Sequence, residues 1–562
     1  MKHVLPIGYE DIKRIIDADL YYVDKSLMIK ELLDTKAQVN LFTRPRRFGK
    51  TLGLSMIRRF FENEFTMRGE KIDNGYLFDQ LNISQCGEEY LCHQQQYPVI
   101  NLSLKSAKQP DFEMARSALI KEIQSEYRRH YYLIDSELLL DVDKQRYRNI
   151  FEGNATPLDY ATALEFLSQC LAAHHGKNVI VLIDEYDVPL ENAYTAGFYE
   201  PMILFIRSLF ESVLKTNPCL EFAVITGCLR ISRESIFTGL NNIKIYSILN
   251  PYFADSFGFT QNEVSEMLAY YGLQEKSTEI KEWYDGYLFG PTDIYNPWSI
   301  INYIDLARAD AKAFPRPYWS NTSANTIIRE LVDNADFTTR QEIEQLLDGS
   351  PLDKPVHEEI TYEDIHQSSE NLWNFLFFTG YLKKTDEYQK EGQIYIKLAI
   401  PNREIQSIYK QTILSWFRQK VKDTDTSALI KAIENGTCDD IAAFISGQLM
   451  ETISFFDYAE NYYHGFLSGL LKASQKYLIY SNRESGLGRS DIIMKTPSAR
   501  GQAVILELKT AKQYTQMADG CQQALKQIED MAYEESLKNE GYTTIKKYGI
   551  CFYRKECLVM KA

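Results

Sequence analysis

The sequence lacks the features that would place it in a membrane or an oxidising compartment. It has no apolar run of about 18 residues, so no membrane-spanning helix is expected. The first residues, MKHVLPIGYEDIKR, have no apolar stretch typical of a secretory signal. The 9 cysteines include no Cys-x-x-Cys pair, which disfavours a zinc site and a disulfide framework. These absences predict a cytoplasmic chain with reduced thiols and no membrane partner.

Positive charge is also scarce, but its distribution is uneven. The whole chain has 62 Lys and Arg against 77 Asp and Glu, a net charge of −15. Residues 461–562 reverse this balance, with 15 basic against 10 acidic side chains. An acidic body is a poor general surface for nucleic acid, whereas a basic terminal region attracts phosphate backbones. We therefore expect any nucleic-acid partner at the C-terminal end.

The stretch from Arg44 to Thr51, RPRRFGKT, follows the β-prone run 39–42 and precedes a helical pattern. Strand, basic loop and helix start in this order are typical of a phosphate-binding P-loop. Lys50 is expected to reach the β- and γ-phosphates of ATP, and the Thr51 hydroxyl to bind Mg²⁺. The loop residues expected to surround the phosphates are Arg46, Arg47, Phe48, Gly49, Lys50 and Thr51. The common pattern has glycine where this chain has Arg44, so an ordinary strand-to-helix turn is the alternative.

A second buried strand is predicted at residues 178–185, where five apolar residues, four of them β-branched, precede two carboxylates. Ligands of parallel sheets bind beyond the carboxyl ends of the strands. Asp184 is therefore expected to hold Mg²⁺, and Glu185 to polarise the attacking water. The alternative is an acidic N-cap for the next helix.

A third strand, residues 220–226, ends in Thr226, which is placed to position the same water. Arg230 and Arg233 follow, and one of them is a candidate for contact with the γ-phosphate; surface arginines at a helix start are the alternative. Another strand is expected at 243–249. Five strands separated by helical stretches predict a three-layer α/β domain with a parallel sheet.

The C-terminal region contains a second candidate site. Residues 491–494 and 502–509 read as two strands joined by a turn. If residue 495 pairs with residue 503, Asp491 lies directly across from Glu507, with Lys509 on the same face. Two facing carboxylates beside a lysine suit Mg²⁺-dependent phosphodiester cleavage, in which Asp491 and Glu507 hold the metal and Lys509 orients or activates water.

Two further features of this region bear on that interpretation. Glu460, on a predicted helix, is the candidate for an additional acid, and Glu484, in a predicted Gly-rich loop at 483–489, is its rival. An exposed hairpin carrying a Glu–Lys pair is the alternative to a catalytic site.

These segments resemble the AAA-ATPase-like family that is fused to a PD-(D/E)XK nuclease-like domain in many bacteria. The resemblance is carried by the following residues: 22–26 (YVDKS), 44–51, 184–187 (DEYD), Thr226, Gly227, Arg230, 283–287 (WYDGY), 295–299 (YNPWS), and Asp491, Glu507 and Lys509. The resemblance implies ATP and Mg²⁺ as cofactors, with Mn²⁺ an option at the nuclease site. It also implies that Arg44 is a family variant of the loop, and that Gln527 and Tyr533 match a nuclease-family signature.

We therefore expect an α/β fold class with four regions. Residues 1–250 form a P-loop, AAA-like ATPase core with a three-layer parallel sheet, and 251–345 form a helical lid. Residues 346–455 form a helical connector, in which 370–410 have the outline of a winged helix; its mixed charge favours a packing module over a DNA reader. Residues 456–562 form the PD-(D/E)XK-like domain.

Three functions are compatible with these patterns. The first is an ATPase that controls a metal-dependent nuclease acting on nucleic acid. The second is an ATP-dependent switch whose nuclease-like domain only binds nucleic acid or a protein. The third, a small-molecule kinase, lacks a recognisable acceptor pocket. The intact Asp491, Glu507 and Lys509 favour the first, and a homo-oligomer is compatible with each.

Overall fold

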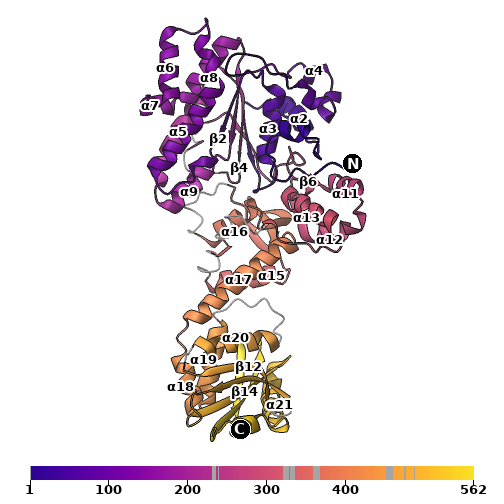
Figure 1. Cartoon of the computed structure of the whole chain (residues 1–562), viewed down its shortest axis with the longest axis vertical. Coiled ribbons are helices and arrows are strands. Elements are labelled where there is room, and N and C mark those ends of the chain that lie inside the picture. Colours follow the sequence, from indigo (N-terminus) through magenta and orange to yellow (C-terminus); the bar gives the residue numbers. More distant parts are fainter. Residues whose placement is uncertain are drawn as a thin grey trace. The chain divides into compact units, whose positions relative to one another are not determined.

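The structure is a computed structural model that describes residues 2–230, 236–237, 240–319, 328–329, 336–358, 368–450, 460–473, 476–485 and 488–562 (Figure 1). The chain divides into two compact units. The first contains Met1–Asn321 and Pro351–Gln406, and the second contains Thr322–Ser350 and Ser407–Ala562. No helix in the described part of the chain combines the length and apolar character needed to cross a bilayer.

The first unit is built on a five-stranded parallel sheet. Its strands are β1 (Val39–Thr43), β2 (Val99–Ser103), β3 (Val179–Asp184), β4 (Leu220–Gly227) and β5 (Ile243–Tyr246), in the order β2-β3-β4-β1-β5. All neighbouring strands pair in parallel. The predicted sheet is therefore confirmed, although β5 ends earlier than expected. Because β4 lies between β1 and β3, the end of β4 separates the P-loop from the acidic end of β3.

Helices cover both faces of this sheet, as the predicted three-layer fold requires (Figure 1). The helices are α1 (Ile12–Asp17), α2 (Leu27–Thr35), α3 (Lys50–Phe61), α4 (Glu88–Leu91), α5 (Phe112–Arg129), α6 (Asp141–Glu152), α7 (Pro157–Ala161), α8 (Ala163–His175), α9 (Val188–Ala196) and α10 (Tyr199–Leu214). Apolar side chains of α2 and α3 share one core with β1 to β4. This packing fixes α3, the helix that follows the P-loop, against the sheet.

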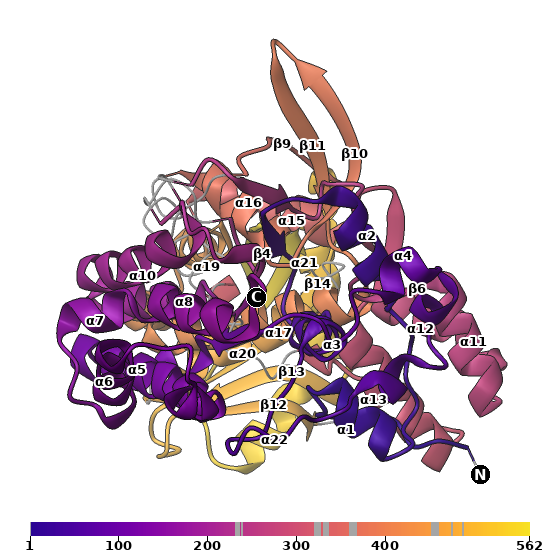
Figure 2. The same cartoon turned by 90° about the horizontal axis from the view of Figure 1, so that it is seen from above.

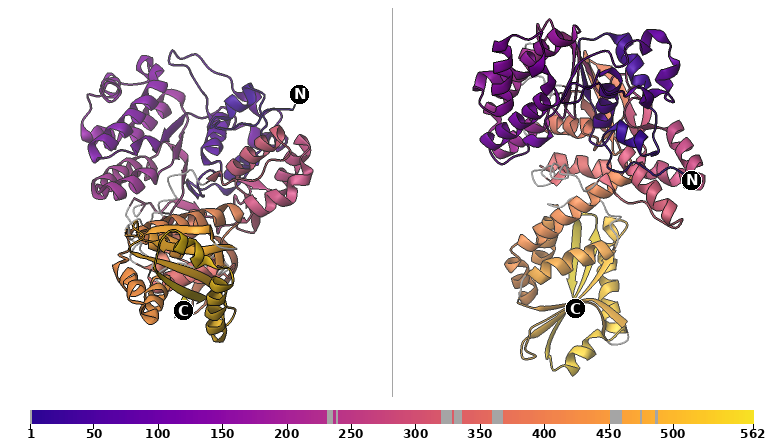
Figure 3. Two further views of the ribbon diagram at one scale, coloured as in Figure 1. Left: turned by 60° about the horizontal axis from the view of Figure 1, so that its bottom comes forward. Right: turned by 45° about the horizontal axis from the view of Figure 1, so that its top comes forward.

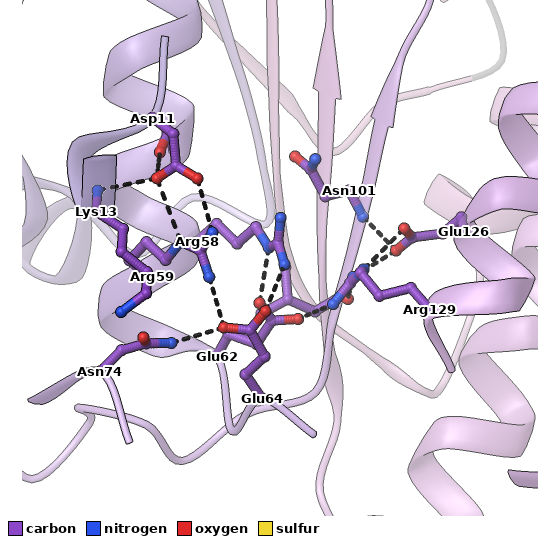
Figure 4. A network of polar contacts seen from close by, with 12 residues as sticks. Asp11, Lys13, Arg58, Arg59, Glu62, Glu64, Asn74, Asn101, Glu126 and Arg129 are labelled. Carbon is purple, nitrogen blue, oxygen red and sulfur yellow. Dashed lines mark hydrogen bonds and ion pairs between the residues drawn. The ribbon is translucent and has the colours of Figure 1, made fainter. Parts of the chain in front are cut away.

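A network of buried charges holds the far end of α3 (Figure 4). Arg129 of α5 pairs with Glu62 and Glu126, which are only 1% and 5% exposed. Arg58 and Arg59 of α3 pair with Glu62, Glu64 and Asp11. Burial alone would raise the pKa of Glu126, but Arg129 and His130 outweigh it and lower the pKa. The carboxylates therefore stay charged, and the network joins α1, α3 and α5.

Residues 259–309 form most of the described part of the predicted lid, 251–345, but they are not entirely helical. The end of the predicted lid, from Thr322, belongs to the second unit. The helices α11 (Gln261–Tyr271), α12 (Ser277–Tyr284) and α13 (Pro297–Ala309) surround a small antiparallel sheet of β6 (Phe259–Thr260), β8 (Thr292–Tyr295) and β7 (Tyr287–Phe289). Gly290, at a φ of 51°, turns β7 into β8. Tyr287 and Phe289 are buried and Leu288 between them is less so, which is the two-residue period of a strand. The segment is too short and too uniformly apolar for this period to be recognised in the sequence.

The region expected as a connector is divided between the two units. β9 (Leu352–Pro355), α16 (Ser369–Phe378), β10 (Lys383–Lys390) and β11 (Gln393–Ala399) belong to the first unit, with sheet order β10-β11-β9. Figure 2 shows the β10–β11 hairpin as a long projection. The predicted outline of helix, strand, turn and strand is present. The turn lies at Glu391 and Gly392, both with positive φ.

The second unit contains the mixed sheet β12-β13-β14-β15-β16 (Figure 3). Its strands are β12 (Leu478–Ser485), β13 (Gly488–Lys495), β14 (Gln502–Thr510), β15 (Thr544–Tyr553) and β16 (Glu556–Lys561). Its helices are α15 (Phe337–Leu347), most of α17 (Arg403–Asp423), α18 (Ser427–Asn435), α19 (Cys438–Met450), α20 (Glu460–Ala473), α21 (Met517–Asp530) and α22 (Tyr533–Asn539).

Two sequence expectations differ from this arrangement. α18 and α19 were expected in a connector, yet their apolar side chains share one core with β13 to β16. The second unit therefore includes more of the chain than the predicted range 456–562. The loop expected at 483–489 instead belongs to β12 and β13, apart from residues 486–487, which lie outside the described part of the chain.

Candidate active sites

The predicted P-loop, residues 44–51, connects β1 to the start of α3. Gly49 has a φ of 88° and caps α3, and Arg47 also has a positive φ of 67°. Left-handed residues in such a loop turn successive amide N–H groups toward one point, which favours an anion. The Lys50 amino group donates to the carbonyl oxygens of Arg44 and Pro45, each at 2.9 Å. Lys50 thus lies folded over the loop, where it can exchange these carbonyls for phosphate oxygens.

Asp184, at the end of β3, is the centre of the first site. One of its carboxylate oxygens accepts from the Thr51 hydroxyl at 2.7 Å, and the other accepts from the Thr226 hydroxyl at 2.5 Å. Asp184 and Thr226 come from the ends of β3 and β4, and Thr51 comes from the first turn of α3, the helix that follows β1. A buried carboxylate with two adjacent hydroxyls offers the hard oxygen ligands that Mg²⁺ prefers. Asp184 is 6% exposed, and the site thus fits Mg²⁺ bound together with phosphate.

Glu185 follows Asp184 in a left-handed conformation, with a φ of 54°. A non-glycine residue with this backbone stores strain, which is common at functional sites. Burial and the adjacent charge of Asp184 raise the pKa of Glu185, whereas Lys50 lowers it. A carboxyl with a raised pKa beside a phosphate site suits a general base.

Asp187 is a site residue that sequence reasoning assigned no role. Its buried carboxylate accepts from the backbone N–H groups of Cys228 and Leu229, at 2.7 and 3.2 Å. These contacts fix the loop after Thr226, whose Cys228 sulfur lies 3.7 Å from the Lys50 amino group. The repeated acid in DEYD is the only signal in the sequence, and it does not reveal a long-range backbone contact.

Arg44 explains the departure from the common P-loop pattern. Its side chain is fully buried and points away from the loop. The guanidinium donates to the carbonyl oxygens of Thr43, Tyr246 and Phe253, at 3.0, 2.7 and 3.0 Å. Burial lowers the pKa of Arg44 to about 9. Arg44 thus ties the start of the P-loop to the segment after β5.

The other basic and aromatic loop residues have partners within the first unit. Arg46 forms an ion pair with Glu191 of α9. The Arg47 guanidinium lies 4.3 Å from the centre of the Trp298 ring. Phe48 is fully buried, so only its backbone is available to a phosphate. These side chains therefore attach the loop to its surroundings, and the amide groups and Lys50 provide the phosphate contacts.

Arg230 lies beyond the end of β4, and its guanidinium is 3.8 Å from the Glu358 carboxylate. Contact between Arg230 and the γ-phosphate would require this pair to open, so the residue stays a prediction. Arg233 lies outside the described residues.

The second site lies on the β13–β14 hairpin. Lys495 pairs with Ala503, and Ile492 with Leu506. The predicted pairing of residue 495 with residue 503 is therefore confirmed, and the pairing extends to Ile492 and Leu506. Asp491 and Glu507 come directly after this last pair, and their facing positions stay a prediction. Here side chains contact the opposite backbone: the Asp491 carboxylate accepts from the N–H of Leu508 at 2.9 Å, and the Glu507 carboxylate accepts from the N–H of Asp491 at 3.3 Å.

The predicted lysine lies beside these acids. The Lys509 amino group is 3.8 Å from a Glu507 oxygen, and Glu507 is only 1% exposed. Burial raises the pKa of Tyr533 of α22, and the charges of Glu507 and Asp491 raise it further. The Gln527 side chain donates to the Tyr533 hydroxyl at 3.4 Å. The hairpin and α22 thus bring together the acids, the lysine and the tyrosine.

His464 of α20 is a neighbour that the sequence did not reveal. Its Nε2 atom lies 2.9 Å from the backbone carbonyl oxygen of Asp491 and 3.0 Å from the Ser481 hydroxyl. Glu460 is one helical turn earlier, but its side chain and that of the rival Glu484 lie outside the described part of the structure.

Two carboxylates and a lysine form a plausible divalent-cation site, because Mg²⁺ takes one or two protein carboxylates together with waters and substrate oxygens. Among the described residues, no group of three or more His, Cys, Asp or Glu side chains forms a larger metal cluster. The donor set at Asp491 and Glu507 fits a Mg²⁺ or Mn²⁺ ion that completes its coordination with other oxygen ligands.

Comparison with known proteins finds one family match over each of the two candidate sites. Residues 6–237 match a family described as "Predicted AAA-ATPase", and residues 458–562 match the PD-(D/E)XK nuclease superfamily. The chain is also 26% identical over 413 residues to an uncharacterized protein from the vnfD 5′ region of Azotobacter chroococcum mcd 1. That alignment covers 73% of this chain and 70% of the relative.

Proposed function

We propose that this chain, which combines an AAA-ATPase-like domain with a PD-(D/E)XK nuclease superfamily domain, binds and hydrolyses ATP and thereby controls Mg²⁺-dependent cleavage of nucleic acid. The observation that carries the nucleotide site is Asp184, held between the hydroxyls of Thr51 and Thr226. At this site Lys50 binds phosphate and Glu185 accepts the proton of the attacking water.

The cleavage step is assigned to Asp491, Glu507 and Lys509. A bound divalent ion would polarise the phosphate and stabilise the developing charge. Asp491 and Glu507 would hold that ion, and Lys509 would orient the attacking water. Residues 461–562, with 15 basic and 10 acidic side chains, supply a positive surface for the nucleic-acid backbone.

An ATP-dependent switch that only binds nucleic acid or a protein is the second candidate. It is favoured by the backbone contacts of Asp491 and Glu507, since each acid already uses one oxygen on the hairpin. The remaining oxygens and the adjacent Lys509 favour cleavage, because a binding module has no need of this set.

The nucleotide site is tested by thermal unfolding with and without Mg-ATP. A ligand that binds only the folded protein stabilises it by about 2.7 kcal/mol at 100 times its Kd. The wild type should therefore melt at a higher temperature with Mg-ATP. Lys50→Ala should lose this shift, while Glu185→Gln should keep it and lose phosphate release. The exposed Lys108→Ala is the matched control, and a full shift in Lys50→Ala would refute the assignment.

The nuclease site is tested by incubating the full chain with plasmid, linear duplex and single-stranded substrates, in Mg²⁺ or Mn²⁺. Asp491→Asn, Glu507→Gln and Lys509→Ala should each reduce cleavage by at least about a hundredfold. Asp530→Asn, at an exposed position of α21, should cut as the wild type does. Binding without cleavage by the wild type would support the second candidate.

A further inference from the structure

Two aromatic motifs, Trp283–Tyr287 and Tyr295–Ser299, have no role in either site. The first runs from the end of α12 to the start of β7, and the second runs from the end of β8 into the first turn of α13. In each motif, one residue contacts one part of the first unit and its neighbour in the chain contacts another part. One partner is the P-loop, and the other is the start of α17, the helix by which the chain passes from the first unit into the second.

On the P-loop side, each motif contacts one loop residue. The Tyr287 ring lies edge-on to Phe48, with ring centres 4.9 Å apart. The Trp298 ring stacks with the Arg47 guanidinium at 4.3 Å. The Tyr318 carbonyl oxygen accepts from both Arg47 and the Trp298 indole, each at 3.3 Å. A change in the backbone of the loop therefore acts on both motifs.

On the α17 side, the adjacent motif residues hold the residues that open the helix. The backbone carbonyl of Asp285 accepts from the Asn402 side chain at 2.7 Å. Gly286, at a φ of 102°, approaches Pro401 so closely that a Cβ atom there would lie 2.2 Å from its carbonyl oxygen. The Ser299 hydroxyl lies 2.8 and 3.1 Å from the two carboxylate oxygens of Glu404.

Glu404, in the first turn of α17, is the charged centre of this contact. It is fully buried and also accepts from the N–H of Trp319 at 2.9 Å. Burial raises the pKa of Glu404 to about 7. The hydrogen bonds that its carboxylate accepts and the positive charge of Arg47 both limit this rise. Burial raises the pKa of Tyr284, Tyr287 and Tyr318, and the charge of Glu404 raises it further. A buried carboxylate costs stability, so a well-packed apolar side chain would serve a purely structural role better.

We infer that the two motifs couple the nucleotide state of the P-loop to the start of α17, and that Glu404 is the positioning residue of this coupling. The inference rests on the proposed ATP site. Phosphate binding changes how Arg47 and Phe48 are held, because both belong to the loop that wraps the phosphates. Trp298 and Tyr287 then move Ser299 and Gly286, their immediate neighbours in the chain. The response reaches Glu404 and Pro401, and hence α17.

The coupling is tested by hydrogen–deuterium exchange of the full chain with and without saturating Mg-ATP. The backbone amides of residues 405–413 should change their exchange rate by about fivefold or more on nucleotide addition, the lower end of typical allosteric coupling. In Glu404→Gln this nucleotide-dependent change should disappear, while the Mg-ATP-induced rise in melting temperature persists. Ser299→Ala, a milder change that removes one donor to Glu404, should reduce it.

Glu279→Gln is the matched control. Glu279 lies in the same region, accepts from Tyr303 at 2.5 Å and pairs with Lys276, and should leave the exchange response intact. An exchange response in Glu404→Gln and Ser299→Ala equal to that of the wild type would overturn the role of Glu404. A wild-type melting shift without any change in residues 405–413 would overturn the coupling alone. No melting shift in the wild type would instead refute the proposed ATP site.

Discussion

Arg44 shows at the scale of a single residue how a P-loop can dispense with its usual first glycine. The glycine is normally needed where the backbone must turn without a side chain in the way. Here the side chain is buried and its guanidinium donates to the carbonyl oxygens of Tyr246 and Phe253. The residue is therefore part of the loop's support, and its charge is not available to a phosphate.

Restoring the common pattern with Arg44→Gly should consequently destabilise the first unit. Each buried carbonyl left without a donor costs about 1–3 kcal/mol, and the lost side chain leaves a cavity. We expect a loss of at least about 3 kcal/mol, measured by thermal or urea unfolding. Arg46→Ala removes a partly exposed ion pair and should cost less than about 1 kcal/mol. Equal stability of Arg44→Gly and the wild type would show that the buried contacts contribute little.

The sequence predicted those site residues whose positions follow from strand ends. Thr51, Asp184 and Thr226 each end or follow a recognisable strand, so their meeting could be expected from the sheet alone. The partners of Arg47 and Phe48 could not, because Trp298 and Tyr287 are more than 200 residues away and no periodicity links them. Local sequence patterns thus indicate where a candidate site lies, whereas contacts between distant segments determine which of its side chains can reach a ligand.

At the scale of elements, the β13–β14 hairpin was predictable because a two-residue period leaves few choices of register. The assignment of α18 and α19 was not. Their apolar faces identify helices that pack on something, but the sequence does not say on what. Ile433 and Ile445 are buried in the same core as Val504 of β14, which only the structure reveals. The local sequence pattern therefore predicts whether a segment is a helix or a strand, but only long-range contacts show to which unit the segment belongs.

Gly286 gives a test at this scale, because it brings the β7 segment against the start of α17. Gly286→Ala would add strain at a positive φ and place a Cβ atom against the carbonyl of Pro401. We expect a loss of about 2–4 kcal/mol and a lower melting temperature of the first unit. Gly392→Ala is the control, since Gly392 has a similar φ but no heavy atom within 4 Å of the added carbon. A similar loss in both variants would mean that the close approach does not matter.

At the scale of the whole molecule, the two units divide the chain at places that the composition does not mark. The second unit takes in α18 and α19 as part of its core. A fragment of residues 424–562 should therefore fold and melt cooperatively. A fragment of residues 456–562 would expose the apolar side chains that cover α18 and α19, and should be largely unfolded or aggregated. Circular dichroism and size-exclusion chromatography of both fragments check this, and a stable 456–562 fragment would contradict it.

The charge network behind α3 has a consequence for how such a sequence can change over evolutionary time. The buried carboxylates of Glu62 and Glu126 both pair with Arg129. Substitution of one member leaves its partner charged and buried, at a cost of about 3–5 kcal/mol. Such a cost is comparable to the whole stability of many domains, so a stepwise replacement passes through a poorly folded intermediate. These positions therefore behave as a single inherited unit: descendants should keep all of the charges or replace them together.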